Sequence, residues 1–165
     1  MSKGLIIGII IFSIVVIGGS YFMLMGGQKP QPQIASYSTT DKERPKVEVK
    51  TTFADLGKMK VSDDKSANFK IKNIGQKPLQ LSNVSSSCNC AFAQVVINGK
   101  ESDIFGMHNI SDFAGEVLQG KEAIIKVTYR PSIMPVYGMV EREVYVTTND
   151  PDNQKLIFKV KATVK

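Results

Sequence analysis

The only two cysteines of the 165-residue chain, Cys88 and Cys90, stand one residue apart in the segment SSSCNC at residues 85–90. Residues two positions apart in an extended strand point to the same face, with their Cα atoms about 6.5–7 Å apart. That distance is at or beyond the limit for an unstrained disulfide. A bond between the two sulfurs therefore requires a sharp turn, and we expect such a bond to be strained and easily reduced.

Two thiolates at this spacing can instead share a soft metal ion such as Cu(I) or Zn. Met107 and His108 stand together further along the chain, and Met134 offers another sulfur. If the segment around His108 folds back over the strand that carries Cys90, either His108 or Met107 completes a three-ligand site. The predicted metal ligands are therefore Cys88, Cys90, His108 and Met107, with copper or zinc as the bound ion.

Simpler interpretations compete with a metal site. Free cysteine is among the most buried residue types and often only fills space in a core. A lone histidine is more often a hydrogen-bonded core or surface residue than a ligand, and Met107 and Met134 are most simply packing residues. We therefore rank a structural or disulfide role for the cysteines first, metal binding second and thiol redox chemistry third.

The sequence contains no recognisable catalytic arrangement. A hydrolase triad needs a histidine base held near a serine or cysteine, yet His108 is the only histidine and no nucleophile-elbow motif surrounds a serine. There is also no glycine-rich phosphate loop leading into a helix, and no histidine pair for a catalytic zinc. We predict a protein that is not an enzyme and has neither catalytic nor cofactor-binding residues.

The elements that must position the cysteines are strands. Apolar and polar residues alternate in three segments, 65–73, 122–130 and 154–164, which indicates strands with one buried face. Four further segments are strand-like but less regular: 47–53, 79–84, 91–97 and 140–147. Seven or eight short strands separated by turn residues predict an all-β fold, an immunoglobulin-like antiparallel β-sandwich, with a small barrel as the alternative.

One segment, residues 100–120, interrupts this pattern. It is long for a hairpin connection, and loops of this length tend to be functional or disordered. Its apolar residues are Ile104, Phe105, Met107 and Phe113. We expect it to pack against the domain and to be the surface that contacts a partner.

The N-terminal part is organised differently. After a tail of residues 1–4, residues 5–25 form an uncharged apolar run that as a helix extends about 31 Å, enough to cross a membrane. No small-residue cleavage site of the kind that follows a signal peptide is evident, so an uncleaved anchor is favoured. Residues 26–46 are polar and rich in Gly, Pro and Gln, which predicts a flexible linker, and residues 47–165 form the domain. Lys3 favours a cytoplasmic N-terminus and places the domain outside the cytoplasm, in the periplasm or extracellular space.

Charge argues against a nucleic-acid partner. The net charge of the chain is +6, but residues 47–165 hold 16 basic and 13 acidic residues, a net charge of +3. Lys and Arg alternate with apolar residues along the strands, as on a solvated sheet face, whereas a nucleic-acid module concentrates them on one face.

Four motifs occur in one order: FxxLG at residues 53–57, FxIxNxGxxPL at residues 69–79, SCxC at residues 87–90 and TNDP at residues 148–151. Together they resemble the bacterial domain-of-unknown-function 1573 family, which is similar to hydin-type and major-sperm-protein-like immunoglobulin domains. The resemblance spans about residues 51–164 and implies an exported sandwich of unassigned activity. We predict a single-pass membrane protein whose sandwich is an interaction or structural module of the cell envelope with a protein partner. The alternative is a soft-metal or thiol-redox protein that uses Cys88 and Cys90.

Overall fold

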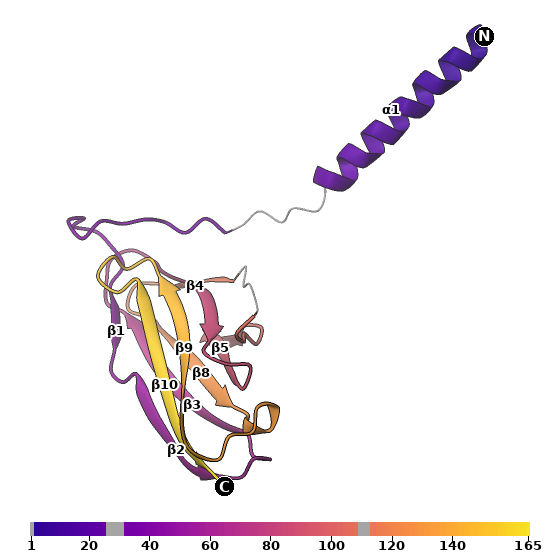
Figure 1. Cartoon of the computed structure of the whole chain (residues 1–165). Coiled ribbons are helices and arrows are strands. Elements are labelled where there is room, and N and C mark those ends of the chain that lie inside the picture. Colours follow the sequence, from indigo (N-terminus) through magenta and orange to yellow (C-terminus); the bar gives the residue numbers. More distant parts are fainter. Residues whose placement is uncertain (1, 26–31, 109–112) are drawn as a thin grey trace. The chain divides into compact units, whose positions relative to one another are not determined.

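The computed structural model describes residues 2–25, 32–108 and 113–165, and the chain divides between Gln31 and Pro32 into two compact units (Figure 1). The first unit is helix α1 (Lys3–Met25). All its described side chains up to Tyr21 are exposed, and a helix that is apolar on every side suits a membrane. By length and composition, α1 can cross a bilayer.

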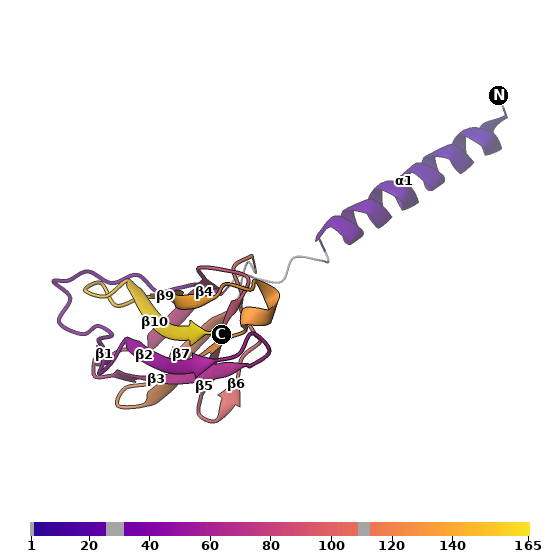
Figure 2. The same ribbon diagram turned by 60° about the horizontal axis from the view of Figure 1, so that its bottom comes forward.

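The second unit is a sandwich of two five-stranded sheets (Figures 1 and 2). The first sheet has the order β1 (Val47–Val49), β3 (Lys65–Asn73), β8 (Glu122–Tyr129), β5 (Ala91–Ile97) and β6 (Lys100–Glu101). The second has the order β2 (Phe53–Met59), β10 (Lys155–Val164), β9 (Gly138–Thr148), β4 (Leu79–Ser86) and β7 (Ala114–Val117). A short 3-10 helix, η1 (Pro131–Ile133), follows β8. The predicted immunoglobulin-like β-sandwich is confirmed.

Three of the ten strands were not expected. Edge strand β2 has little alternation because most of its side chains are exposed, and it pairs in parallel with β10 whereas every other strand pair is antiparallel. Strands β6 and β7 lie in the segment 100–120, where they are only two and four residues long. Such short strands leave no periodic signal in a sequence.

The core lies between the two sheets and consists of the inward-facing residues of both. On β8, every second side chain is buried, and the rings of Phe69 from β3 and Phe158 from β10 meet with their centroids 5.1 Å apart. The alternation that predicted these strands therefore follows from burial of one face per sheet.

The sandwich has two unlike ends (Figure 1). The "linker end" carries the segment 32–46 before β1 and the turns at residues 74–78, 118–121 and 149–154. The "disulfide end" carries the turns at residues 60–64 and 87–90 and the connection 130–137. Strand β9, eleven residues long, runs from one end to the other over about 35 Å.

Residues 32–46, which the sequence assigns to the linker, belong to the compact second unit. The Ala35 N–H donates to Gln80 Oε1 (2.7 Å), and the Arg44 carbonyl accepts from the Gln76 N–H (3.0 Å). Pro45 is buried, and a Cβ on Gly75 would overlap the backbone of residues 44–46. Glycine at position 75 therefore lets this segment cross close over the turn. The remainder of the predicted linker, residues 26–31, lies outside the described residues.

Candidate functional site

The turn between β4 and β5 holds both cysteines. Cys88 and Cys90 are joined by a disulfide, and their Cα atoms are 5.2 Å apart, closer than in an extended strand. The chain therefore turns sharply here, as a bond at this spacing requires. The Ser86 hydroxyl donates to the Cys88 carbonyl (2.8 Å), and the Ala91 N–H donates to the same oxygen (3.3 Å).

The two sulfurs have different surroundings. Cys90 is fully buried at 0% exposure, whereas Cys88 is partly exposed. Arg142 Nε donates to Cys90 Sγ at 3.1 Å, and the Cys90 N–H donates to Cys88 Sγ at 3.2 Å. In the part of the chain that the structure describes, the cationic side chain at this disulfide thus contacts the buried sulfur.

Arg142 is a residue of this site that the sequence analysis missed. Its guanidinium lies 5.7 Å from the centroid of the Tyr129 ring, and its Nη1 donates to the Glu141 carbonyl at 2.9 Å. A signal was present in the sequence: Arg142 is the charged member of the inward-facing register of β9, among valines. A charge in a buried register needs a partner, and here that partner is Cys90 Sγ.

The other predicted metal ligands, Met107 and His108, are exposed. They follow Phe105, whose backbone pairs with Ala93 of β5 in an antiparallel bridge (2.8 Å in both directions). An antiparallel bridge at Ala93 directs the following residues back toward the start of β5, where Cys90 lies. Within residues 2–25, 32–108 and 113–165, no group of three or more His, Cys, Asp or Glu side chains could hold a metal ion. Because both sulfurs are bonded to each other, a copper or zinc site stays a prediction for the reduced cysteines.

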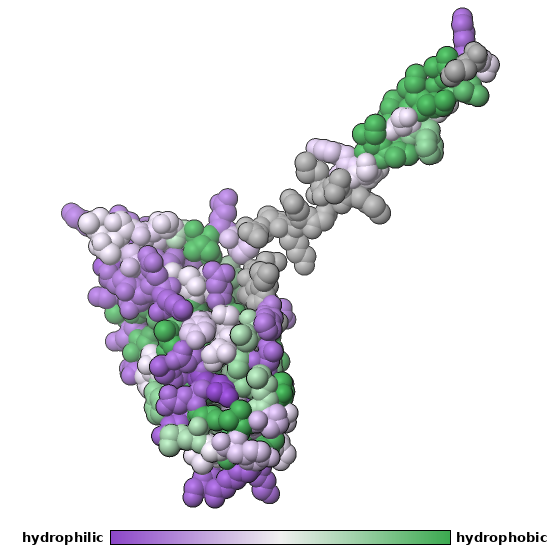
Figure 3. Space-filling model, in the orientation of Figure 1, coloured by the Kyte–Doolittle hydropathy of each residue, from purple (hydrophilic) through white to green (hydrophobic). Residues whose placement is uncertain are grey.

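The connection from β8 to β9 exposes an unusual number of large apolar side chains. We call these residues the apolar loop: Ile133, Met134, Val136, Tyr137 and Met139. Tyr137 is 71% exposed and Met139 69%, and residues 131–139 contain no charged side chain. Figure 3 shows hydrophobic surface at the lower right edge of the sandwich, over this connection. Contiguous exposed apolar surface of this kind marks interaction sites.

Beside the apolar loop, strand β9 has an open edge. Strand β10 pairs with β9 from Gly138 onward, but the pairing of β4 with β9 covers only Val144–Thr148. Glu143 continues that side by exchanging hydrogen bonds with Ser87: its carbonyl accepts from the Ser87 N–H (2.9 Å) and its N–H donates to the Ser87 hydroxyl (3.0 Å). Among the described strands, the stretch from Gly138 to Arg142 therefore has a neighbour on one side only.

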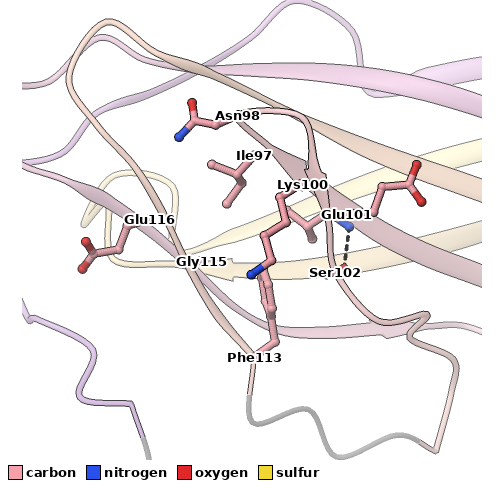
Figure 4. Close-up of a pocket in the computed structure, with 9 residues that line it drawn as sticks. Ile97, Asn98, Lys100, Glu101, Ser102, Phe113, Gly115 and Glu116 are labelled. Atoms are coloured by element: carbon pink, nitrogen blue, oxygen red, sulfur yellow. Dashed lines mark hydrogen bonds between the residues drawn. The ribbon is translucent and has the colours of Figure 1, made fainter.

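The segment 100–120 forms a second feature, which includes the edge strands β6 and β7 of the two sheets. Phe105 and Val117 are buried, and the rings of Phe105 and Phe113 lie 5.3 Å apart between centroids, so the segment packs on the sandwich. A hollow of about 370 Å³ lies between β6 and β7 (Figure 4). Its lining residues are Val95, Ile97, Asn98, Lys100, Glu101, Ser102, Phe113, Gly115 and Glu116.

On the outer face of the second sheet, polar groups are paired with one another. Lys159 Nζ lies 2.8 Å from the Glu143 carboxylate, and the Tyr145 hydroxyl donates to that carboxylate at 2.8 Å. These two contacts, with Lys159 the stronger, lower the pKa of Glu143 below its ordinary value. A carboxylate held ionised by a neighbouring lysine is not poised for acid–base chemistry near neutral pH.

Comparison with solved structures shows the same fold. A protein of unknown function from Porphyromonas gingivalis W83 is 20% identical with a TM-score of 0.55; the match covers 73% of this chain and 47% of that one. This chain thus spans about half the length of the Porphyromonas protein. Weaker likenesses are to an ASH/PapD-like domain of human CEP192 (14% identity, TM-score 0.45, 82% and 98% covered) and to the secreted serine protease VesC from Vibrio cholerae (11%, 0.44, 74% and 23%).

No functionally curated protein matches the sequence. The hydin-type resemblance of the four motifs is confirmed by a family model, which matches residues 45–163, nearly all of the sandwich. The chain therefore belongs to the HYDIN/CFA65/VesB-like immunoglobulin-like domain family.

Proposed function

We propose that the chain is a membrane-anchored protein whose sandwich, outside the cytoplasm, binds a partner protein of the cell envelope at the disulfide end. Helix α1 is the uncleaved anchor, with the N-terminus in the cytoplasm. The observation that carries the proposal is the apolar loop beside the open edge of β9. Large exposed apolar side chains and unpaired strand backbone are both costly in water, and here they occur together.

The partner contributes an extended apolar segment that adds to the edge of β9. Residues of one strand alternate in the side to which their backbone groups point. Because Glu143 bonds to Ser87 on the β4 side, Glu141 and Met139 turn their backbone groups to the same, open side. The Glu141 carbonyl already accepts from Arg142 Nη1 (2.9 Å), so the partner's main-chain hydrogen bonds go to the Glu141 N–H and to Met139. These bonds supply affinity, and the side chains of the apolar loop select apolar partner residues.

A lipid surface fits this site less well than a protein does. Hydrocarbon tails can cover Tyr137 and Met139, but they offer no donors or acceptors for the open strand edge. The apolar loop also contains no Lys or Arg to attract anionic headgroups. A peptide strand satisfies both the apolar side chains and the backbone.

Site-specific photo-crosslinking in intact cells tests the proposal. A benzophenone amino acid placed at Tyr137 or Met139 of the full chain should give one protein adduct of defined mass. The matched control is Ile74, an apolar residue of the linker end that is also exposed (46%). Loss of the Tyr137 adduct when Met134 and Val136 are changed to Ser supports a specific apolar contact.

The other outcomes contradict the proposal in distinct ways. Equal adducts from Ile74 and Tyr137 point to random collision, and adducts with lipid point to a membrane-binding loop. An adduct of twice the chain's own mass points to a homodimer through β9. Replacing residues 102–108 with a Gly-Ser connection tests the other predicted contact surface: if the adduct at Tyr137 persists, the segment 100–120 is not required.

The anchor and the orientation need their own test. The intact mass of the chain purified from membranes should correspond to a chain that begins at Met1 or Ser2, because α1 is retained. A phosphatase active only outside the cytoplasm, fused after Lys165, should be active. A mass that corresponds to a chain beginning after residue 20 would overturn this part of the proposal. An inactive fusion would overturn it as well.

A further inference from the structure

The disulfide at the β4–β5 turn is chemically asymmetric. Cys88 is partly exposed and lies in a surface turn, whereas Cys90 is buried and its Sγ accepts a hydrogen bond from Arg142 (3.1 Å). In thiol–disulfide exchange, an incoming thiolate attacks the accessible sulfur, and the other sulfur leaves more rapidly the better its negative charge is stabilised. The two cysteines are thus suited to different steps of the same reaction.

We propose that Cys88–Cys90 is a thiol–disulfide exchange site that accepts electrons from a dithiol outside the cytoplasm. A thiolate of that dithiol attacks Cys88 Sγ, the Cys88–Cys90 bond breaks, and Cys90 leaves as a thiolate. The second thiol of the dithiol then attacks the mixed disulfide and releases Cys88. Two electrons and two protons pass to the cysteine pair, and the dithiol becomes a disulfide.

Arg142 is held in place for this role. Its guanidinium stacks over Tyr129, and its Nη1 is fixed by the Glu141 carbonyl. A cation at hydrogen-bond distance stabilises a thiolate, and here that sulfur is Cys90. Arg142 acts on the reaction through Cys90 and makes no contact with the attacking dithiol, so it is a positioning residue.

Two other charged groups near this end are paired with partners other than the cysteines. Arg130 Nε pairs with Asp64 (2.9 Å), and the Glu143 carboxylate pairs with Lys159 (2.8 Å). Among the described residues, Arg142 is the charged side chain that hydrogen-bonds to the sulfurs. The charge in direct contact with Cys90 Sγ is therefore the Arg142 guanidinium.

The fold does not depend on this bond to hold its turn. A disulfide that closes a ring of three residues removes little entropy from the unfolded chain. The turn is already fixed by the Ser86 hydroxyl on the Cys88 carbonyl and by the two hydrogen bonds between Ser87 and Glu143. A bond that contributes little to folding can open and close without unfolding the domain.

This inference is independent of the proposed partner binding, since exchange at Cys88 needs neither the apolar loop nor the open edge of β9. The test uses the full chain in detergent micelles, with dithiothreitol as the dithiol. Reduction is followed by the mass gain of alkylated cysteines at fixed pH. The variants are Arg142→Met, which removes the charge, and Arg142→Lys, which keeps it. The matched control is Arg130→Met, which removes an equal charge from the same end.

We expect Arg142→Met to slow reduction about tenfold, because the leaving thiolate loses its cation. Arg142→Lys should restore most of the rate, and Arg130→Met should leave it within about twofold, since long-range charges are screened. Unchanged rates in Arg142→Met, or equal slowing in Arg130→Met, would overturn the proposal. A disulfide that dithiothreitol does not reduce in the folded chain would overturn it as well.

A second measurement covers the case in which Arg142→Met does not fold. The single variants Cys90→Ser and Cys88→Ser each keep one thiol, and their rates with an aromatic disulfide reagent are compared. Cys88, kept in Cys90→Ser, should react at least ten times faster than the buried Cys90 kept in Cys88→Ser. Equal rates, or a faster Cys90, contradict the assigned order of attack.

Discussion

The two ends of the sandwich differ in which groups lie at the ends of the two sheets. At the linker end, Asn73 and Asp150 are fully buried and their side chains bond to the backbone of the turns around them. At the disulfide end, five large apolar side chains are exposed to solvent. Among the described strands, the stretch of β9 from Gly138 to Arg142 is paired on one side only, by β10. The same two sheets therefore end in a buried polar network on one side, where Ile74 and Leu118 are nevertheless exposed, and in the apolar loop on the other.

The difference separates stability from function within one domain. Asn73 Nδ2 donates to the carbonyls of Lys77 (2.8 Å) and Val117 (2.9 Å), and its Oδ1 accepts from the Gly75 N–H (2.9 Å). Such satisfied buried networks fix a unique structure. Places where a domain breaks the rules of burial and pairing are expected to be functional, and in this molecule the apolar loop and the open edge of β9 lie together at the disulfide end.

The largest effect is expected from breaking the network of the linker end with Asp150→Ala. The carboxylate accepts from the N–H groups of Val47 (2.9 Å) and Asp152 (3.0 Å) and from Asn153 Nδ2 (3.0 Å). Loss of these bonds leaves buried donors without partners, so the free energy of unfolding should fall by about 3–4 kcal/mol. Urea unfolding of the detergent-solubilised chain, followed by circular dichroism, measures it.

The conservative variant Asp150→Asn separates shape from hydrogen bonding. The amide keeps the volume and one acceptor oxygen, so this variant should lose less stability than Asp150→Ala. If Asp150→Ala unfolds at the same urea concentration as the wild type, the buried network is not what closes the linker end.

Breaking the bond of the disulfide end should cost less. The double variant Cys88→Ala/Cys90→Ala removes a ring of three residues, and the chain-entropy model assigns such a ring about 1.5–2 kcal/mol. Urea unfolding of the double variant under oxidising conditions gives its free energy of unfolding. The same titration of the wild type under oxidising and under reducing conditions gives the values for comparison. A loss as large as that of Asp150→Ala would mean that the disulfide is a brace for the fold, which would contradict a readily opened bond.

The sequence predicts features that depend on residues close together in the chain. It does not predict contacts between residues that are far apart in the chain. Strands β3 and β8 lie where alternation predicted them, at residues 65–73 and within 122–130, because alternation is the direct trace of a buried sheet face. Strand β2 escaped prediction because its exposed edge position removes that trace. The motif NxGxxPL indicates a turn in the sequence. The contact of Asn73 with Val117 joins residues 44 positions apart, so no local sequence pattern indicates it.

The disulfide end was predicted only in part for a similar reason. The spacing of Cys88 and Cys90 specifies the sharp turn that the structure has. The contact between Arg142 and Cys90 joins residues 52 positions apart and depends on which strands face each other across the sandwich. The open edge of β9 depends on where β4 ends, and strand ends are the least certain part of any sequence-based assignment.

Changing the apolar loop should leave stability almost untouched. Tyr137 and Met139 are exposed, so the double variant Tyr137→Ser/Met139→Ser should unfold within about 0.5 kcal/mol of the wild type. The same urea titration measures this. The matched control is Val140→Ser, a neighbouring position that is buried (6%) and should lose about 2 kcal/mol or more. A large loss in the double variant would mean that the loop packs within the domain and is not an uncovered surface.

The smallest effect is expected from the surface ion pair of the linker end, Arg44 with Asp152 (2.8 Å). The hydrogen bond from Arg44 lowers the pKa of Asp152 below its ordinary value of 3.8. A lowered pKa in the folded state stabilises the protein above the unfolded pKa, and this contribution is lost as the pH falls through the folded pKa.

The melting temperature of Asp152→Asn should therefore lie slightly below that of the wild type at neutral pH, and the two should converge below about pH 3. Added salt should shrink the difference at neutral pH, because exposed pairs are screened. Arg44→Gln should show the same convergence, and a gap that stays constant down to low pH would mean that the charge of Asp152 does not help to close this end.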